Sequence, residues 1–140
     1  MKILIDKVSA KPLHGISEAE LQKVIEALPP EWIAEISTIR LSNSIDPVKE
    51  TYYSRYKHLL TVYSRGRKRQ NIIRAIFKEL AAHSLGFRNI SDVRARRINH
   101  IIDPPVEKLL ATFPRPKPNP VYPRTLNFRV ASIKRTTLSP

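Results

Sequence analysis

Residues 72–86 read IIRAIFKELAAHSLG, and the spacing of their apolar side chains decides the fold that the chain can adopt. The apolar residues recur three and four positions apart, as they do along one face of an α-helix, which predicts a helix over residues 68–85. The side chains expected on its core-facing side are Ile72, Ile73, Ile76, Phe77 and Leu80. Gly86 stands where a glycine commonly ends a helix in the left-handed conformation.

A second helix is predicted nearer the start of the chain. Ser17 and Glu20 form the S-x-x-E pattern of a capping box, in which each side chain bonds the backbone N–H of the other residue. Apolar residues at helical spacing then predict one buried stripe, formed by Leu21, Val24, Ile25 and Leu28. Pro29 and Pro30 are expected to end this helix, because proline lacks the N–H that a helix needs.

Strands are predicted between these two helices. Residues 37–42 alternate in polarity, which places Ile39 and Leu41 on one face. Residues 52–63 are rich in aromatic and β-branched side chains, as strands are. Within them we expect a strand over residues 58–63 that pairs with residues 52–56.

Shorter helices are predicted after Gly86. Ser91 is expected to cap a helix over residues 92–101. Pro104 and Pro105 then predict the start of a separate helical segment, whose apolar residues are Val106, Leu109, Leu110 and Phe113.

From residue 114 the composition changes. The prolines of PRPKPNPVYPR remove backbone donors and predict an extended, polyproline-like tail. Residues 126–130 alternate in polarity and could add an edge strand to this domain or to a partner. The sequence therefore predicts an α+β domain over residues 1–113, in which a small mixed sheet packs against the long helix and additional short helices. A basic, proline-rich tail over residues 114–140 follows it.

The charge of the chain is large and uneven. The sequence has 25 Lys and Arg, 12 Asp and Glu, and a formal net charge of +13. Residues 1–50 hold six basic and eight acidic side chains, and residues 51–140 hold 19 basic and four acidic ones, a balance of +15. Such an asymmetry indicates an acidic partner, most simply nucleic acid. The alternative is a basic surface that only keeps the protein in solution.

Several classes of protein are excluded by composition. The absence of cysteine excludes disulfides, cysteine–zinc sites and thiol catalysis, and it fits a reducing cytoplasm, where we expect the protein. The sequence contains no run of 18 apolar residues, so it predicts no membrane span. The apolar stretch near residue 1 is too short for a secretory signal.

The basic residues cluster in two places. Ser64-Arg65-Gly66-Arg67-Lys68-Arg69 leads into the long helix, whose N-terminal N–H groups favour phosphate. The helix predicted over residues 92–101 adds further arginines. The candidate nucleic-acid-binding residues are Arg65, Arg67, Lys68, Arg69, Arg94, Arg96 and Arg97. The first cluster could equally be a solvated loop.

Tyrosines lie close to cations in the strand region. Tyr52, Tyr53 and Tyr56, near Arg55 and Lys57, could stack on nucleic-acid bases. Tyrosine is also an ordinary strand residue, and propensity alone favours that second interpretation.

The order of these features resembles small zincin-type metallopeptidase domains of the minimal gluzincin kind. The resemblance spans about residues 17–100 and includes the capped helix, the motif L-P-P-E-W, a strand ending in V-Y-S-R-G-R, and the long helix followed by G-F. It implies that the strand forms the edge of a cleft and that the helix carries H-E-L-A-H-H. That motif falls on residues 78–83, KELAAH.

The departures from the motif bear on the chemistry. A catalytic zinc needs three protein ligands and an open position for water. Lys78 stands in place of the first histidine and carries a positive charge without an acceptor, and Ala82, in place of the second, has no ligand atom. Glu79 matches the family's general base, but without metal-bound water it has nothing useful to deprotonate. The resemblance also implies a downstream glutamate ligand, and none occurs between His83 and Val106.

A shifted metal site is the remaining metal hypothesis. Glu79 and His83 lie four residues apart and share a helix face. His100 or Asp92 could supply a third ligand, with Asp103 as a further possibility. The alternative is that Glu79 pairs with a cation or a strand while His83 lies at the edge of the core.

The sequence therefore predicts a degenerate zincin-like scaffold that binds nucleic acid or another anionic partner, such as an acidic protein surface, without catalysis or a cofactor. A protein-interaction module or inhibitor is the second hypothesis, and an atypical metal-dependent hydrolase is the third.

Overall fold

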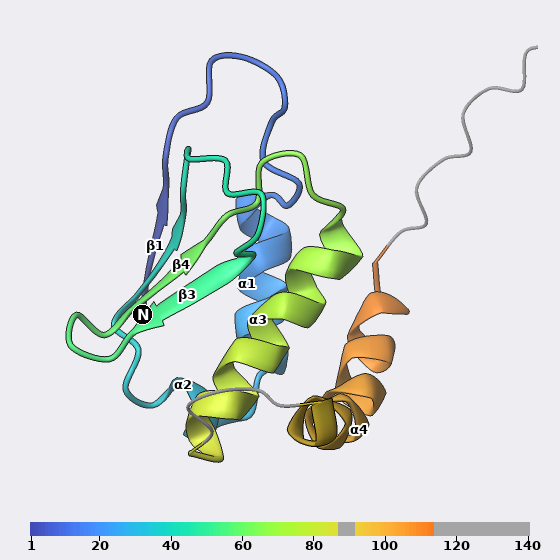
Figure 1. Ribbon diagram of the computed structural model, residues 1–140. Coiled ribbons are helices and arrows are strands. Elements are labelled where there is room, and N and C mark those ends of the chain that lie inside the picture. Colours follow the sequence, from blue (N-terminus) through green and yellow to red (C-terminus); the bar gives the residue numbers. More distant parts are fainter. Residues whose placement is uncertain (87–91, 114–140) are drawn as a thin grey trace, which may run out of the picture.

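The structure, a computed structural model, describes residues 1–86 and 92–113, and of residues 92–95 it describes the backbone alone. A mixed sheet lies on one side and the helices on the other, as Figure 1 shows. The strands are β1 (Lys2–Ile5), β2 (Thr38–Leu41), β3 (Thr51–Ser54) and β4 (Leu59–Val62). The helices are α1 (Glu18–Ala27), α2 (Pro30–Ile33), α3 (Arg69–Ser84) and α4 (Asp92–Leu110). The expected α+β class is confirmed.

The four strands lie in the order β1-β2-β4-β3. β1 and β2, and β2 and β4, pair in parallel, whereas β3 and β4 form the predicted antiparallel pair. A parallel pair needs a long crossover, and α1 lies in the connection between β1 and β2. Neither β1 nor α2 was predicted from the sequence. The cleft-edge strand implied by the resemblance is also corrected, because β4 lies inside the sheet and β3 forms its edge.

The core lies between the sheet and α3. All five apolar side chains predicted for this helix are at most 1% exposed, as are Ile39, Leu41, Leu60 and Val62 of the sheet. Each such side chain contributes about 1.5–3 kcal/mol when it leaves water. Trp32 of α2 meets Phe77 edge-on, with ring centroids 6.3 Å apart. The apolar stripe read from the sequence is therefore confirmed.

The predicted start of α1 is confirmed in atomic detail. The Glu20 N–H donates to Ser17 Oγ at 3.2 Å, and the Ser17 N–H donates to Glu20 Oε1 at 2.9 Å. Glu20 also forms an ion pair with Arg69 at the start of α3. Burial alone would raise the pKa of Glu20, but the hydrogen bonds from Ser17 and Arg69 outweigh it and lower the pKa. The cap therefore also ties α1 to α3.

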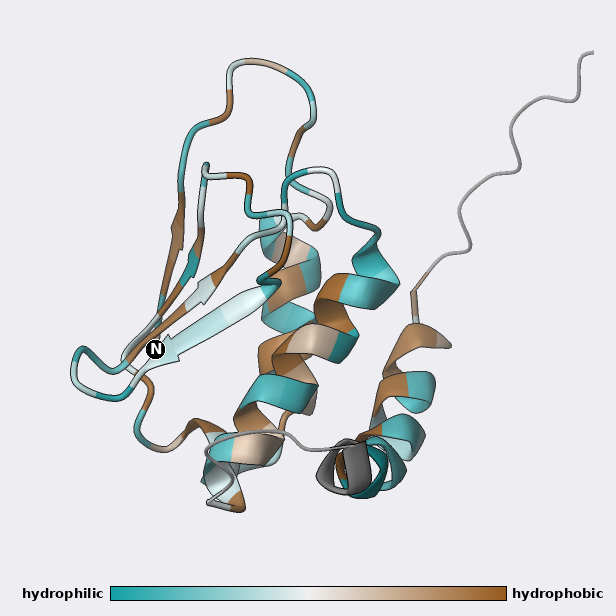
Figure 2. Cartoon of the chain, viewed as in Figure 1, coloured by the Kyte–Doolittle hydropathy of each residue, from teal (hydrophilic) through white to brown (hydrophobic). Residues whose placement is uncertain are grey.

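Helix α4 corrects the prediction of two separate segments, because one helix runs through Pro104 and Pro105. The apolar side chains of Ile98, Ile102, Val106 and Leu109 form one buried stripe across the prolines. In Figure 2 the hydrophobic residues in the second part of α4 lie on the side that faces α3. The prolines deprive the carbonyls of His100 and Ile101 of donors. Both residues are exposed, so water can bond those carbonyls.

Two further expectations concern the C-terminal tail and membrane-spanning helices. The tail over residues 114–140, with the strand over 126–130, lies outside the described residues. None of the helices within the described ranges is both long and apolar enough to cross a bilayer.

Two glycines make a matched test of the packing. A Cβ on Gly15 would lie 1.8 Å from the Arg67 carbonyl oxygen, whereas Gly86, with a φ of +78°, has open space around it. We expect Gly15→Ala to lower the free energy of unfolding by about 3 kcal/mol, the upper range for overpacking. Gly86→Ala should cost about 1 kcal/mol, the strain of the left-handed conformation. Chemical denaturation measures both, and equal losses would contradict the close approach at Gly15.

Candidate functional site

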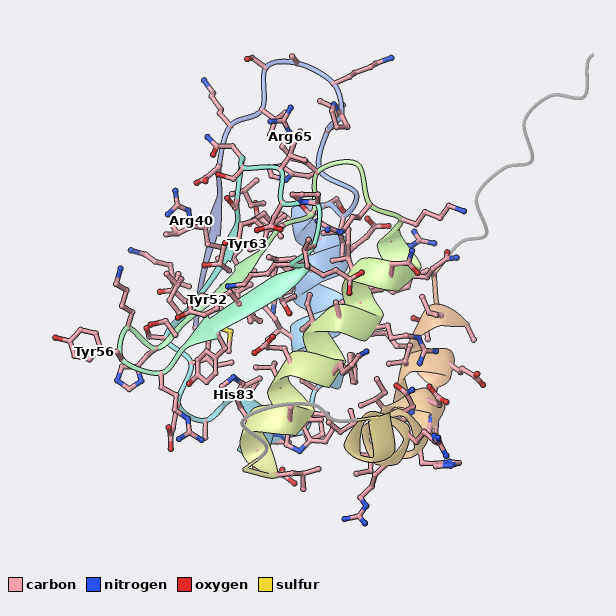
Figure 3. All side chains as sticks on the ribbon, in the orientation of Figure 1. Arg40, Tyr52, Tyr56, Tyr63, Arg65 and His83 are labelled. Atoms are coloured by element: carbon pink, nitrogen blue, oxygen red, sulfur yellow. The ribbon has the colours of Figure 1, made fainter. Side chains whose placement is uncertain are left out.

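The guanidinium of Arg65 holds two loops together. Its three nitrogens donate to the backbone carbonyls of Pro12 at 2.9 Å, Asn43 at 2.8 Å and Ala10 at 3.0 Å. The rigid fork of a guanidinium suits such a set of acceptors. Arg65 is therefore an internal brace, and Figure 3 shows it among the loops at one end of the sheet.

The other arginines of the basic turn also have internal partners. Arg67 donates to the carbonyls of Tyr63 and Asp46, each at 2.7 Å. Arg69 pairs with Glu20, and its guanidinium lies 4.7 Å from the ring centroid of Phe113. Lys68, by contrast, is exposed and makes no side-chain capping bond to α3.

The second group of predicted cations lies elsewhere. Arg96 and Arg97 are exposed on the first half of α4, and the side chain of Arg94 lies outside the described residues. Phe113, just beyond α4, contacts Arg69 at the start of α3, so the first turns of α4 lie near the far end of α3 (Figure 1). The 16 residues of α3 span about 24 Å. The two groups of cations therefore lie toward opposite ends of α3.

The three hydrogen bonds of Arg65 predict that its loss lowers the stability of the fold. Arg65→Ala should lower the free energy of unfolding by about 1–2 kcal/mol, because three backbone carbonyls lose their donor. Lys68→Ala, a change of equal charge on the same turn, should stay within about 0.5 kcal/mol. Thermal or chemical unfolding provides the comparison. Equal effects from the two variants would mean that Arg65 is not structural.

Glu79 and His83 form a network that joins α3 to β3. Glu79 Oε2 lies 2.9 Å from His83 Nε2, and Glu79 Oε1 accepts a hydrogen bond from Thr51 Oγ1 at 2.9 Å. The ring of His83 packs edge-on against the ring of Tyr53, with ring centroids 4.6 Å apart. A hollow of about 250 Å³ adjoins His83 and includes Glu31, Glu35 and Arg55 in its lining. Both oxygens of Glu79 thus already have partners on the protein.

Neither His100 nor Asp103, the two remaining metal candidates whose side chains the structure describes, is brought to this pair. No group of three His, Cys, Asp or Glu side chains close enough to hold a metal occurs among the residues that the structure describes. His100 is exposed on α4, and Asp103 is paired with Arg74. The side chain of Asp92 lies outside the description.

The resemblance implies zinc-binding histidines at positions 78 and 82, and the residues found there lie in different surroundings. Lys78 lines a hollow of about 180 Å³ together with Glu50, Thr51 and Glu79. Ala82 is 5% exposed and belongs to the hydrophobic core. An imidazole at position 82 would meet packed side chains.

The face of the sheet away from the helices carries a third hollow, of about 390 Å³. Arg40, Tyr52, Lys57 and Tyr63 are among its lining residues. Arg40 and Tyr63 were not among the candidate residues read from the sequence. The signal for them was available, because the period of two along β2 and β4 places alternate side chains on one face.

Arg40 is held in place by Asp6. The Arg40 Nε lies 3.0 Å from Asp6 Oδ1, and Nη2 lies 2.9 Å from Oδ2. The hydrogen bond from Arg40 lowers the pKa of Asp6 below its ordinary value, and the Asn43 N–H adds to that shift.

This shift predicts how stability depends on pH. A carboxyl whose folded-state pKa is lowered stabilises the fold above its unfolded pKa, about 3.9, and that stabilisation is lost as pH falls through the lower folded pKa. Asp6→Asn should cost at most about 1 kcal/mol at neutral pH, because Arg40 is half exposed and water screens the pair. Unfolding of both proteins across pH 2–7 checks this, and a difference that persists at the acid end would contradict it.

A comparison of this chain with known proteins gave no match to a protein-family model, to a curated protein or to a solved structure.

Proposed function

We propose that the chain is a non-catalytic nucleic-acid-binding protein on a scaffold that resembles a zincin domain without its metal site. The observation that carries this proposal is the balance of +15 over residues 51–140. Two of the four carboxylates in that part of the chain, Glu79 and Asp103, already have internal partners. Phosphates are the most abundant groups that such a positive field attracts.

The exposed cations from the predicted set contribute to this field. Lys68, Arg96 and Arg97 are all exposed, although they lie at opposite ends of α3. The braced arginines, Arg65 and Arg67, add their charge from fixed positions. In this proposal the cations attract and orient a polyanion from both ends of the long helix.

The non-catalytic character is supported by the long helix itself. Lys78 and Ala82 occupy the positions of two expected ligands, and the carboxylate of Glu79 is bonded by Thr51 and His83. General-base chemistry of the zincin kind needs a metal-bound water beside that carboxylate.

One observation favours the protein-interaction hypothesis. β3 lies at the edge of the sheet, and an edge strand can pair with an extended segment of another protein. An acidic protein would also suit the positive field. The experiment therefore needs an acidic polypeptide as a competitor.

We expect the protein to bind random-sequence oligonucleotides at about 50 mM salt, with the logarithm of the affinity falling linearly as the logarithm of the salt concentration rises. Fluorescence anisotropy with labelled strands measures this. Poly-glutamate of equal charge is the matched competitor, and it should bind at least about tenfold more weakly, because it lacks bases for stacking. Absence of binding to nucleic acid at low salt would overturn the proposal, and equal binding of poly-glutamate would favour the acidic-protein alternative.

A further inference from the structure

We propose that the outer face of the sheet, the side away from the helices, is a stacking platform for single-stranded nucleic acid. In this site Tyr52 and Tyr63 stack on bases, while Arg40, Lys49 and Lys57 contact phosphates. The inference rests on the proposed function and specifies both the surface and the form of nucleic acid that it takes.

The pairing of β3 with β4 brings the two tyrosines together. Tyr52 lies opposite Thr61, and the Tyr63 N–H donates to the Glu50 carbonyl at 2.9 Å, which continues the same register. Tyr52 and Tyr63 are therefore diagonal neighbours, about 7–8 Å apart at the backbone. Their neighbours Tyr53 and Val62 are buried on the opposite face, so both tyrosines belong to the outer face, as Figure 3 shows.

The rest of the outer face leaves these rings accessible. One row across the sheet reads Leu4, Arg40, Thr61 and Tyr52, from β1 to β3. The next row reads Lys2, Thr38, Leu59 and Ser54. Because Thr61 and Ser54, the neighbours of Tyr52 in these rows, are small, the tyrosine rings border a hollow, and Tyr52 is 48% exposed. An exposed aromatic ring above small residues can receive a base on its face.

The positive side chains in and beside this hollow favour a polyanion as its ligand. Lys49 Nζ lies 4.7 Å from the centroid of the Tyr52 ring, and the hollow is lined by Arg40 and Lys57. None of its ten described lining residues is a carboxylate. The two hollows described above, beside His83 and beside Lys78, each include two glutamates in their linings. Of the three, only the hollow on the outer face combines aromatic rings and cations with no carboxylate in its lining. Asp6, outside that lining, pairs with Arg40, whereas Lys57 lines the hollow and is exposed.

The geometry favours a single strand over a duplex. The bases of a duplex are paired and stacked on each other, so their faces are closed to a tyrosine ring. Single strands expose those faces, and stacking tolerates any base sequence. The extended β3–β4 pair offers successive ring and cation positions along which a strand can lie.

The test uses the full chain and labelled oligo-uridine and oligo-thymidine of about 12 nucleotides, within the range of known single-strand sites. Tyr52→Ala and Tyr63→Ala should each weaken binding about tenfold, because one stacked base is worth about 5- to 150-fold in affinity. The phenylalanine variants at both positions should bind within about twofold of the wild type, because stacking needs the ring and not the hydroxyl.

Tyr56→Ala is the matched control. Tyr56 is 93% exposed at the β3–β4 turn, outside the lining of the hollow (Figure 3), so its loss should leave the affinity within about twofold, since the stacked bases lie elsewhere. Circular dichroism confirms that each variant is folded.

The outcomes separate this inference from the function on which it rests. Single strands bound with unchanged affinity by the Tyr52 and Tyr63 alanine variants would overturn the platform and leave nucleic-acid binding in place. An equal loss in Tyr56→Ala, or duplex bound as tightly as single strand, would also overturn the platform. Failure of the wild type to bind any nucleic acid would overturn both.

Discussion

The structure depends on the burial of α3 on two sides. Eight of its 16 residues are buried, since the sheet covers one side of the helix and α4 covers another. Within the described residues every helix lies on the same side of the sheet (Figure 1). The described part of the chain places no helix on the opposite face of the sheet, so the side chains on that face are not needed to fill the core. This constraint is what allows Tyr52, Tyr63 and their neighbouring cations to gather on one open surface.

The basic turn illustrates how charge in a sequence can serve two purposes. Arg65 and Arg67 bond five backbone carbonyls from three segments of the chain. They stabilise the loops that follow β1 and β2, because an unbonded carbonyl in these loops would cost free energy. They still contribute to the positive field, since a guanidinium keeps its charge when it donates to carbonyls. A nucleic acid can thus be attracted by residues that it does not contact.

The sequence predicted most of the fold because local patterns coincide with packing. The S-x-x-E cap, the apolar stripe of α3 and the β3–β4 pair are short-range features, and the structure confirms them. The prediction that the helix breaks at Pro104 was wrong. The apolar side chains from Ile98 to Leu109 pack on α3, and this packing overrides the local effect of proline. β1 was missed because its residues, KILI, do not alternate in polarity as those of a half-buried strand do. At the site, the partners of Arg65 lie 22 to 55 positions away in sequence, so spacing alone could not reveal them.

The most direct test of the account is a map of the surface that a single strand occupies. Backbone amide shifts measured by NMR during titration with oligo-uridine should change for residues of β2, β3 and β4 around Arg40, Tyr52 and Tyr63. The amides of α3 and α4 should change little, since the strand lies on the other side of the sheet. Changes confined to the basic turn and the first half of α4 would contradict the account and place the nucleic acid on the helical side.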